Sequence, residues 1–160
     1  MQPKRFSLLM KSVIIALAVF GAGFYFYFVP RVLRVIDSLK LFTDKSLFMP
    51  WLILIVLTCI PCYAVLVLAW GMAVSVQNDK QFSHKNSGRL KKIAVCAIAD
   101  TGFFFIGNLI FWIIGINIPA VVVISAIILF VGIAFAAASD VLSGMVEKAA
   151  ILQEENDLTI

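Results

Sequence analysis

Charged residues are scarce in this chain of 160 residues: Asp, Glu, Lys and Arg make up 14% of it, whereas 62% is apolar. Soluble domains are about a quarter charged and roughly half apolar. The composition therefore excludes an ordinary soluble domain and indicates one integral membrane domain, residues 1–160, with the lipid bilayer as a partner. The formal net charge of +4 does not indicate direct nucleic-acid binding, because cytoplasmic loops of membrane proteins are rich in Lys and Arg.

Histidine and cysteine are also scarce, with one and three residues respectively. A single histidine, His84, excludes a histidine-based metal site or catalytic triad, and three cysteines do not form an even disulfide framework. The phosphate-binding loop, the H-E-x-x-H metal motif and the nucleophile elbow are all absent. We therefore expect no catalytic residue, no metal and no cofactor, and we do not expect an enzyme.

Four apolar segments are long enough to cross a bilayer, which takes about 20 residues. We expect spans at about 8–30, 49–74, 93–115 and 118–140. A cleaved signal peptide is the alternative for the first, because Gly21 and Gly23 resemble a cleavage site. The first run is long for that purpose, and its aromatic cluster at residues 24–28 is typical of a membrane interface.

The third and fourth spans are separated by the sequence GINIP, residues 115–119. Gly115 suits a helix C-terminus, Asn117 an N-cap and Pro119 the first turn of the next helix. In the second span, Pro61 is expected to kink the helix and to leave one backbone carbonyl free.

An all-α, integral-membrane four-helix bundle is the expected fold class. Backbone groups in lipid must be hydrogen-bonded within the protein, and the spans show no alternating strand pattern. Small residues four apart, Gly132 with Ala136 and Ala134 with Ala138, permit close helix approach.

The distribution of Lys and Arg predicts that both termini lie in the cytoplasm. That N-in, C-in orientation places nine basic residues inside, namely Lys4, Arg5, Lys11, Lys80, Lys85, Arg89, Lys91, Lys92 and Lys148. Four lie outside, namely Arg31, Arg34, Lys40 and Lys45.

Two segments outside the spans have amphipathic patterns. In residues 31–42, Val32, Val35, Ile36 and Leu39 share one face, which suits an outer helix in the membrane interface; a plain loop is the alternative. In residues 140–155 the shared apolar face is Leu142, Met145, Val146, Ala149 and Leu152, opposite Asp140, Ser143, Gly144, Glu147 and Glu154. The last helix is therefore expected to extend into the cytoplasm, within residues 141–160.

Asp100 is the main candidate for chemistry, because it lies eight residues past Lys92, about 12 Å into the third span. An acid at such depth is costly and marks a functional-site candidate, here a proton-binding or coupling carboxylate. Asn108 lies beside its helix face as a second intramembrane polar residue. The alternative is a structural pair between Asp100 and Lys11 of the first span.

The sequence Cys59-Ile60-Pro61-Cys62 has the spacing of a thioredoxin-type dithiol. A reactive thiolate needs an electropositive, accessible setting, whereas this pair lies within an apolar helix far from any charged residue in sequence. A kink at Pro61 with two small packing cysteines is the simpler interpretation.

Two cytoplasmic segments carry opposite charge. The basic loop 77–92 includes Lys80, Lys85, Arg89, Lys91 and Lys92, and Ser83 is positioned to cap a helix there. Such a loop attracts anionic lipid at roughly 1 kcal/mol per base, and it could instead bind the acidic tail. The tail, Glu154, Glu155, Asn156, Asp157, Leu158, Thr159 and Ile160, is a candidate partner-binding segment.

We expect the last helix to break near Asn156, since acids at a helix C-terminus oppose the helix dipole. Leu158 and Ile160 would then point the same way on an extended strand that could add to a sheet edge. A frayed, solvated terminus is the alternative.

The sequences FSHKN, LKKIAVCAIADTGFFFIGNLIF and VLSGMVEKAAILQEENDLTI, within residues 80–160, resemble the YoaS-like family of bacterial membrane proteins, a domain of unknown function. The resemblance implies a small four-span protein of the bacterial cytoplasmic membrane with no established activity. Genes of the family often neighbour a small helix-turn-helix regulator, which implies, by analogy, a membrane component that holds or signals to a DNA-binding protein. It implies no catalytic residues.

Three functional hypotheses follow. The first is a non-enzymatic membrane protein whose inner face docks a cytoplasmic regulator. The second is a small transporter, or a channel formed by a homo-oligomer, that uses Asp100. The third and weakest is a membrane dithiol oxidoreductase.

Overall fold

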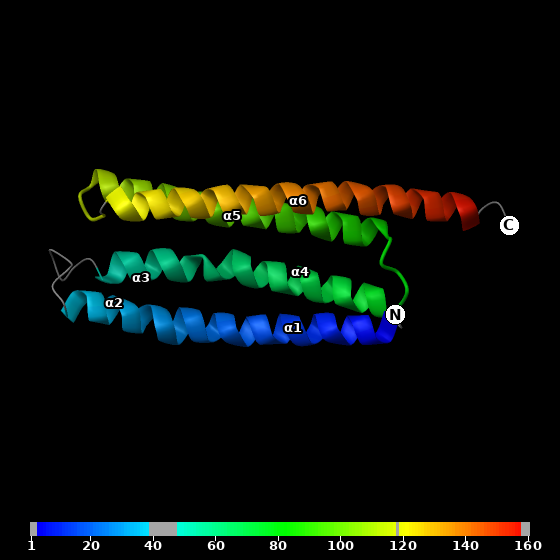
Figure 1. The fold of residues 1–160 in the computed structure, drawn as a ribbon, viewed down its shortest axis with the longest axis horizontal. Coiled ribbons are helices and arrows are strands. Elements are labelled where there is room, and N and C mark those ends of the chain that lie inside the picture. Colours follow the sequence, from blue (N-terminus) through cyan, green and yellow to red (C-terminus); the bar gives the residue numbers. More distant parts are fainter. Residues whose placement is uncertain (1–2, 39–47, 118, 158–160) are drawn as a thin grey trace.

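The computed structural model describes residues 3–38, 48–117 and 119–157, and the regular structure in these residues is helical (Figure 1). The helical elements are α1 (Pro3–Gly23), the π-helical turn η1 (Phe24–Phe28), α2 (Val29–Ser38), α3 (Phe48–Leu57), α4 (Cys59–Gln77), α5 (His84–Ile113) and α6 (Pro119–Asp157). They form four stretches long and apolar enough to cross a membrane. The predicted all-α fold with four such helices is confirmed.

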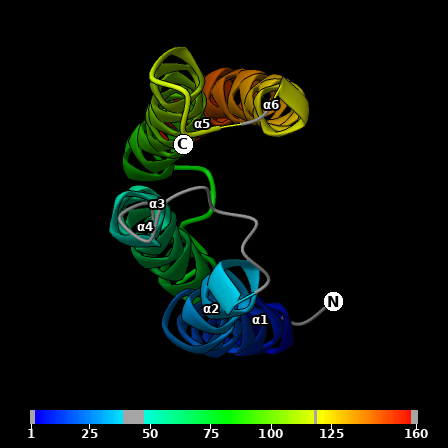
Figure 2. The same cartoon turned by 90° about the vertical axis from the view of Figure 1, so that its left-hand side faces the viewer.

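The four long helices lie side by side in an arc and do not close into a compact bundle. Helix α6 packs on α5, α5 on α4 and α4 on α1. No comparable contact joins α1 to α6 among the described residues, and the view along the helices shows these two at the ends of the arc (Figure 2). The expected bundle is therefore an open layer with a concave side.

Small residues hold the helices together, and the large apolar side chains face outward. Among the described residues, half of the eight buried apolar ones are alanines, and exposed Leu, Ile, Val and Phe side chains occur on every long helix. This pattern suits a bilayer, where lipid-facing apolar groups cost nothing and helix contact depends on close approach. Gly132 and Ala136 face α5 as their spacing suggests, whereas Ala134 and Ala138 point away from it.

Two helix irregularities lie opposite each other, and each is next to a proline. Pro61 lacks an N–H, and the helix is interrupted at Thr58, between α3 and α4, close to the place where the sequence predicts a kink. Pro30 follows η1, where Val29 N–H bonds the carbonyl of Phe24 five residues back. Helix α2 then continues along the line of α1 as far as Ser38 (Figure 1). The predicted outer helix is thus helical over residues 31–38, and its remainder, including Leu39, lies outside the described residues.

The turn between α5 and α6 forms largely as the sequence indicates. Gly115 has φ +78°, and its N–H and that of Ile116 close the end of α5 by bonding the carbonyls of Trp112 and Phe111 at 3.0 and 2.8 Å. Pro119 begins α6 as predicted. Asn117, predicted as an N-cap, donates from its side-chain Nδ2 to Asn108 Oδ1 at 3.0 Å.

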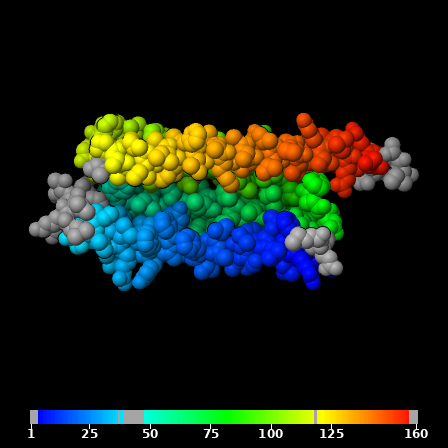
Figure 3. All heavy atoms as spheres, viewed as in Figure 1, coloured from blue at the N-terminus to red at the C-terminus, as the bar shows by residue number. Residues whose placement is uncertain are grey.

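Helix α6 runs past all the other described helices at the end of the molecule where both termini lie (Figures 1 and 3). We call this end the inner end, following the predicted orientation. Glu147 of α6 meets His84, the first residue of α5, so ten residues of α6 (148–157) extend beyond that contact. At the helical rise this is a projection of about 15 Å. The predicted extension of the last helix is present.

Candidate functional site

A chain of polar side chains crosses three helices at the level of the two irregularities. The Cys62 thiol of α4 donates to Asp100 Oδ2 of α5 at 3.4 Å, and the Tyr25 hydroxyl of η1 donates to Cys62 Sγ at 3.5 Å. The same hydroxyl lies 3.1 Å from Thr58 Oγ1, which itself donates to the Ile55 carbonyl at 2.7 Å. The π-turn and the Pro61 break thus direct Tyr25 and Thr58 toward the intramembrane carboxyl.

One oxygen of Asp100 has no partner. Its Oδ1 atom is buried without a hydrogen bond, although Oδ2 accepts from Cys62. A buried polar atom left unsatisfied costs about 1–3 kcal/mol, so such an atom in a stable fold requires an explanation. The proposed structural pair with Lys11 is wrong, because Lys11 Nζ donates to Gln77 Oε1 at 2.5 Å and lies over the Trp70 ring.

A cavity of about 590 Å³ adjoins Asp100, bordered by α1, η1, α4, α5 and α6. A smaller one of about 300 Å³ lies toward the outer end, and Asp100, Thr101, Tyr25 and Ile128 border both. Because α1 and α6 do not pack together, this space lies between the two ends of the arc. The open packing therefore leaves room beside the orphaned carboxyl oxygen.

The dithiol pattern gains no support from its surroundings. Cys59 and Cys62 are free thiols, and the groups that contact Cys62 are a phenol and a carboxyl. Neither group supplies the positive charge that stabilises a reactive thiolate. The structure instead makes Cys62 the link between Tyr25 and Asp100.

Asn108, the second predicted intramembrane polar residue, has a structural position. Its side chain is fully buried, its amide donates to the Phe104 carbonyl at 2.8 Å, and its oxygen accepts from Asn117. The two intramembrane polar residues therefore have different positions: Asn108 stabilises the turn after α5, and Asp100 borders a cavity.

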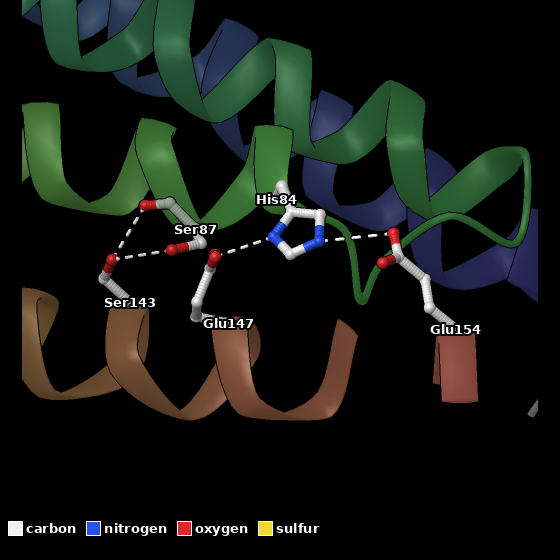
Figure 4. A network of polar contacts seen from close by, with 5 residues as sticks. All are labelled: His84, Ser87, Ser143, Glu147 and Glu154. Carbon is white, nitrogen blue, oxygen red and sulfur yellow. Dashed lines mark hydrogen bonds and ion pairs between the residues drawn. The ribbon is translucent and has the colours of Figure 1, made fainter. Parts of the chain in front are cut away.

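At the inner end, His84 joins α5 to the acidic residues of α6 (Figure 4). Its Nδ1 lies 2.6 Å from Glu147 Oε1, and its Nε2 lies 3.2 Å from Glu154 Oε1. Next to this contact, Ser87 Oγ and Ser143 Oγ are 3.0 Å apart, and Ser143 donates to the Ser87 carbonyl at 2.9 Å. We call His84, Glu147 and Glu154 the clasp.

The clasp lies outside the apolar spans, and its partners shift each other's protonation. Hydrogen bonds to Glu147 and then Glu154 raise the pKa of His84 above its ordinary value. The bond from His84, followed by one from Ser87, lowers the pKa of Glu147. The three side chains are 41–67% exposed, so water screens their attraction. The sequence offered one signal for this contact: Glu147 and Glu154 are seven residues apart and share a helix face.

The residues of the predicted basic loop divide into two groups. Arg89 Nη1 donates to the Gly71 carbonyl, to Ser75 Oγ and to Asn86 Oδ1 at 2.7–2.9 Å, and so joins α4 to α5. Asn86, which is buried, donates to the carbonyls of Lys80 and Gln81 and holds the connection in place. The other four, Lys80, Lys85, Lys91 and Lys92, are exposed. Residues 84–92 belong to helix α5, and Ser83 precedes it without a side-chain capping bond.

The acidic tail is helical as far as the structure describes it. Helix α6 includes Glu154, Glu155, Asn156 and Asp157, and the residues after Asp157 lie outside the described residues, so the break near Asn156 stays a prediction. The predicted strand at Leu158, Thr159 and Ile160 lies outside the described residues. One acid of the tail, Glu154, does contact the predicted basic loop 77–92, because its side chain meets that of His84.

From residue 139 onward, helix α6 buries small residues and exposes large apolar ones. Ser139, Ser143 and Ala150 are 3–5% exposed and face α5. Leu142, Met145 and Leu152 are 50%, 63% and 63% exposed. Met145 and Leu152 lie on the opposite side of the helix, and Leu142 lies on its flank. We call these three residues the apolar stripe.

Three comparisons with known proteins bear on this arrangement. The family described as "Protein of unknown function (DUF2975)" matches residues 43–160. The "Uncharacterized membrane protein YoaS" of Bacillus subtilis (strain 168) is 29% identical over 138 residues, which cover 84% of each chain. No solved structure matches. Together with the four apolar helices, these findings identify a multi-pass membrane protein.

Proposed function

This chain belongs to the DUF2975 family of proteins of unknown function, and from that premise we propose that it is a non-enzymatic membrane protein whose inner end docks a small cytoplasmic DNA-binding regulator. The observation that carries the proposal is the apolar stripe on the projecting part of α6. The regulator is the partner that the family resemblance implies, and the features of the stripe agree with such a partner.

The stripe is a surface that the described chain does not cover. Met145 and Leu152 lie on a helix that continues directly from the last span, with no break between residues 119 and 157. A helix that leaves the membrane in a straight line cannot also lie flat in the interface, so lipid does not bury its outer turns. Exposed apolar groups outside the bilayer and next to polar ones mark an interaction site.

Charge favours a basic partner over a second copy of the same extension. Residues 141–157 contain four acids, Glu147, Glu154, Glu155 and Asp157, against one base, Lys148, for a net charge of −3. Two such extensions would repel each other, whereas a DNA-binding protein presents positive charge. An amphipathic helix is a common docking element, with anchors spaced as Leu142, Met145 and Leu152 are.

A matched pair of substitutions tests this role. Leu152→Gln removes an anchor of the stripe, and Ile151→Gln makes the same kind of change at the adjacent exposed residue, about 100° around the helix. The tagged protein is purified from its native membrane with bound proteins, which are identified by mass spectrometry and tested for DNA binding. We expect a small basic DNA-binding protein to be lost with Leu152→Gln and kept with Ile151→Gln. Equal recovery with both variants, or no DNA-binding protein with the parent, overturns the proposal.

A second candidate function is transport or channel activity that uses Asp100. What favours it is the orphaned Oδ1 atom beside a cavity at membrane depth. Ion flux into liposomes with the parent protein and with Asp100→Asn tests it. Flux that the substitution abolishes supports transport, and the absence of flux in the parent excludes it.

A further inference from the structure

We infer that the cavity beside Asp100 binds a lipophilic amine, that is, a hydrophobic molecule with one protonated nitrogen. The inference does not depend on the docking proposal, and it requires binding but no transport. It rests on three observations: the size and lining of the cavity, the missing partner of Asp100, and the absence of any Lys or Arg in the membrane segments.

The cavity has the size and character of a small-molecule site. Its volume of about 590 Å³ falls in the range of ligand pockets, which are mostly apolar with a few polar groups that set orientation. Leu17 of α1, Leu66 of α4, and Ile127 and Val131 of α6 supply apolar walls. Asp100 is the charged residue among the described residues that line it.

The carboxyl group needs a donor that its neighbours do not provide. Oδ2 of Asp100 accepts from the Cys62 thiol, a weak donor, and Oδ1 accepts from nothing. An ionised carboxylate in hydrocarbon is costly unless it is paired and hydrogen-bonded. A protonated amine supplies both the opposite charge and a charge-assisted hydrogen bond to Oδ1.

The described residues of this chain place no cation beside Asp100. The sequence contains no Lys or Arg within residues 12–30, 46–79 or 93–147. The basic residues nearest the inner end of the spans are already engaged, Lys11 with Gln77 and Arg89 with the Gly71 carbonyl. A bound ligand is therefore the source of the cation that this inference requires.

The depth of Asp100 selects a ligand with a hydrophobic body. The residue lies about 12 Å from Lys92 along the helix, well below the level of lipid headgroups. An acyl chain that reached this depth would carry no donor for Oδ1, so a phospholipid tail does not meet the requirement. Tyr25 and Tyr63 also line the cavity, and aromatic faces attract cations. The Tyr63 hydroxyl is held by the Ala18 carbonyl at 2.7 Å, which orients that ring.

Two probes with the same hydrocarbon body separate charge from hydrophobicity: 1-adamantylamine, which is protonated at neutral pH, and 1-adamantanol, which is neutral. Each is radiolabelled and measured by equilibrium dialysis against proteoliposomes, with empty liposomes subtracted. We expect saturable binding of the amine, about one molecule per chain, and no saturable binding of the alcohol.

Three variants locate the binding. Asp100→Asn is expected to weaken amine binding by at least about tenfold, or about 1.4 kcal/mol. Asp140→Asn, the same change at an exposed acid near the inner membrane edge, is expected to have no effect. Leu17→Trp, which fills the cavity and leaves Asp100 intact, is expected to reduce binding as well. Circular dichroism and gel filtration verify that each variant is folded.

Three outcomes overturn the inference: no saturable amine binding by the parent, equal binding of amine and alcohol, or equal affinity in the parent and a folded Asp100→Asn. The comparison of the two probes uses the parent protein alone, so it decides the matter even if Asp100→Asn does not fold. These outcomes leave the docking proposal untouched, because its test uses residues of the α6 extension.

Discussion

The Asp100 cluster and the inner end both join helices through polar side chains, but only the inner end is internally complete. There, Arg89 bonds three oxygens, Asn86 holds the connection between α4 and α5, and both ring nitrogens of His84 contact carboxylates. In the membrane, by contrast, Asp100 keeps one buried oxygen without a partner beside a cavity. Polar groups at the inner end join the helices to one another, whereas the carboxyl of Asp100 keeps the free oxygen on which the proposed ligand site rests.

The largest expected effect on stability comes from the contact between α5 and α6, because these two helices share the most extensive interface among the described elements. A side chain at Gly132 would overlap Thr101, whereas Gly144, further along α6, has open space around it. Overpacking costs about 1–3 kcal/mol and more where backbones must separate. We therefore expect Gly132→Leu to lower thermal stability in detergent strongly and Gly144→Leu to leave it nearly unchanged, as measured by circular dichroism. Equal melting curves for the two variants would show that the helices do not approach here.

Removal of the Arg89 side chain tests whether the polar contacts at the inner end stabilise the fold. Arg89→Ala leaves the Gly71 carbonyl and Asn86 Oδ1 without this donor, and we expect a loss of about 2–4 kcal/mol in the free energy of unfolding. Lys85→Ala, a change at an exposed base four residues earlier on α5, serves as the control and should stay within about 0.5 kcal/mol of the parent. Denaturant titration in micelles measures both, and similar losses would mean that net charge matters more than the bonds of Arg89.

Loss of the clasp should have the smallest effect on stability, and that effect should depend on pH. The pKa of His84 is raised, so its contribution is complete below the ordinary pKa of 6.5 and is lost as pH rises through the raised pKa. The pKa of Glu147 is lowered, so its contribution is complete above the ordinary pKa of 4.5 and is lost as pH falls through the lowered pKa. The clasp is therefore strongest between about pH 4.5 and 6.5.

Hydrogen exchange of backbone amides in residues 147–157 measures the clasp. After correction for the intrinsic pH dependence of exchange, we expect better protection at pH 6 than at pH 8.5, and no such difference in His84→Ala. A pH response that survives in His84→Ala would assign it to other groups on α6.

Local sequence signals predicted the elements of the fold well. Gly115 and Pro119 located the turn between α5 and α6, Pro61 located the break before α4, and the isolated charge at Asp100 pointed to the polar cluster beside the cavity. Gly115, Pro119 and Pro61 act through their own backbone conformation, and Asp100 stands out as a charge within an apolar segment. Both kinds of signal can be recognised from the neighbouring residues alone.

Features that depend on how helices face each other were not predictable. The register that places Ser87 against Ser143 also brings His84 to Glu147, and no local pattern encodes that register. Arg89 appeared as one more base of a loop, although its role depends on a carbonyl 18 residues away. The amphipathic pattern of residues 140–155 was visible, but it did not show that the apolar side faces away from α5. The open arc was not predictable either, because it depends on whether α1 and α6 pack together, and no local pattern shows that.

The stability of Asp100→Asn tests most directly whether the intramembrane carboxyl serves a ligand and not the scaffold. We predict that the folded variant unfolds at the same or a higher denaturant concentration than the parent, because a charge-bearing group in hydrocarbon is replaced by a neutral one of the same shape. Unfolding in micelles at neutral pH, with circular dichroism as the signal, gives the answer. A loss of about 2 kcal/mol or more would contradict the account, since it would mean that the Asp100 carboxylate holds the helices together.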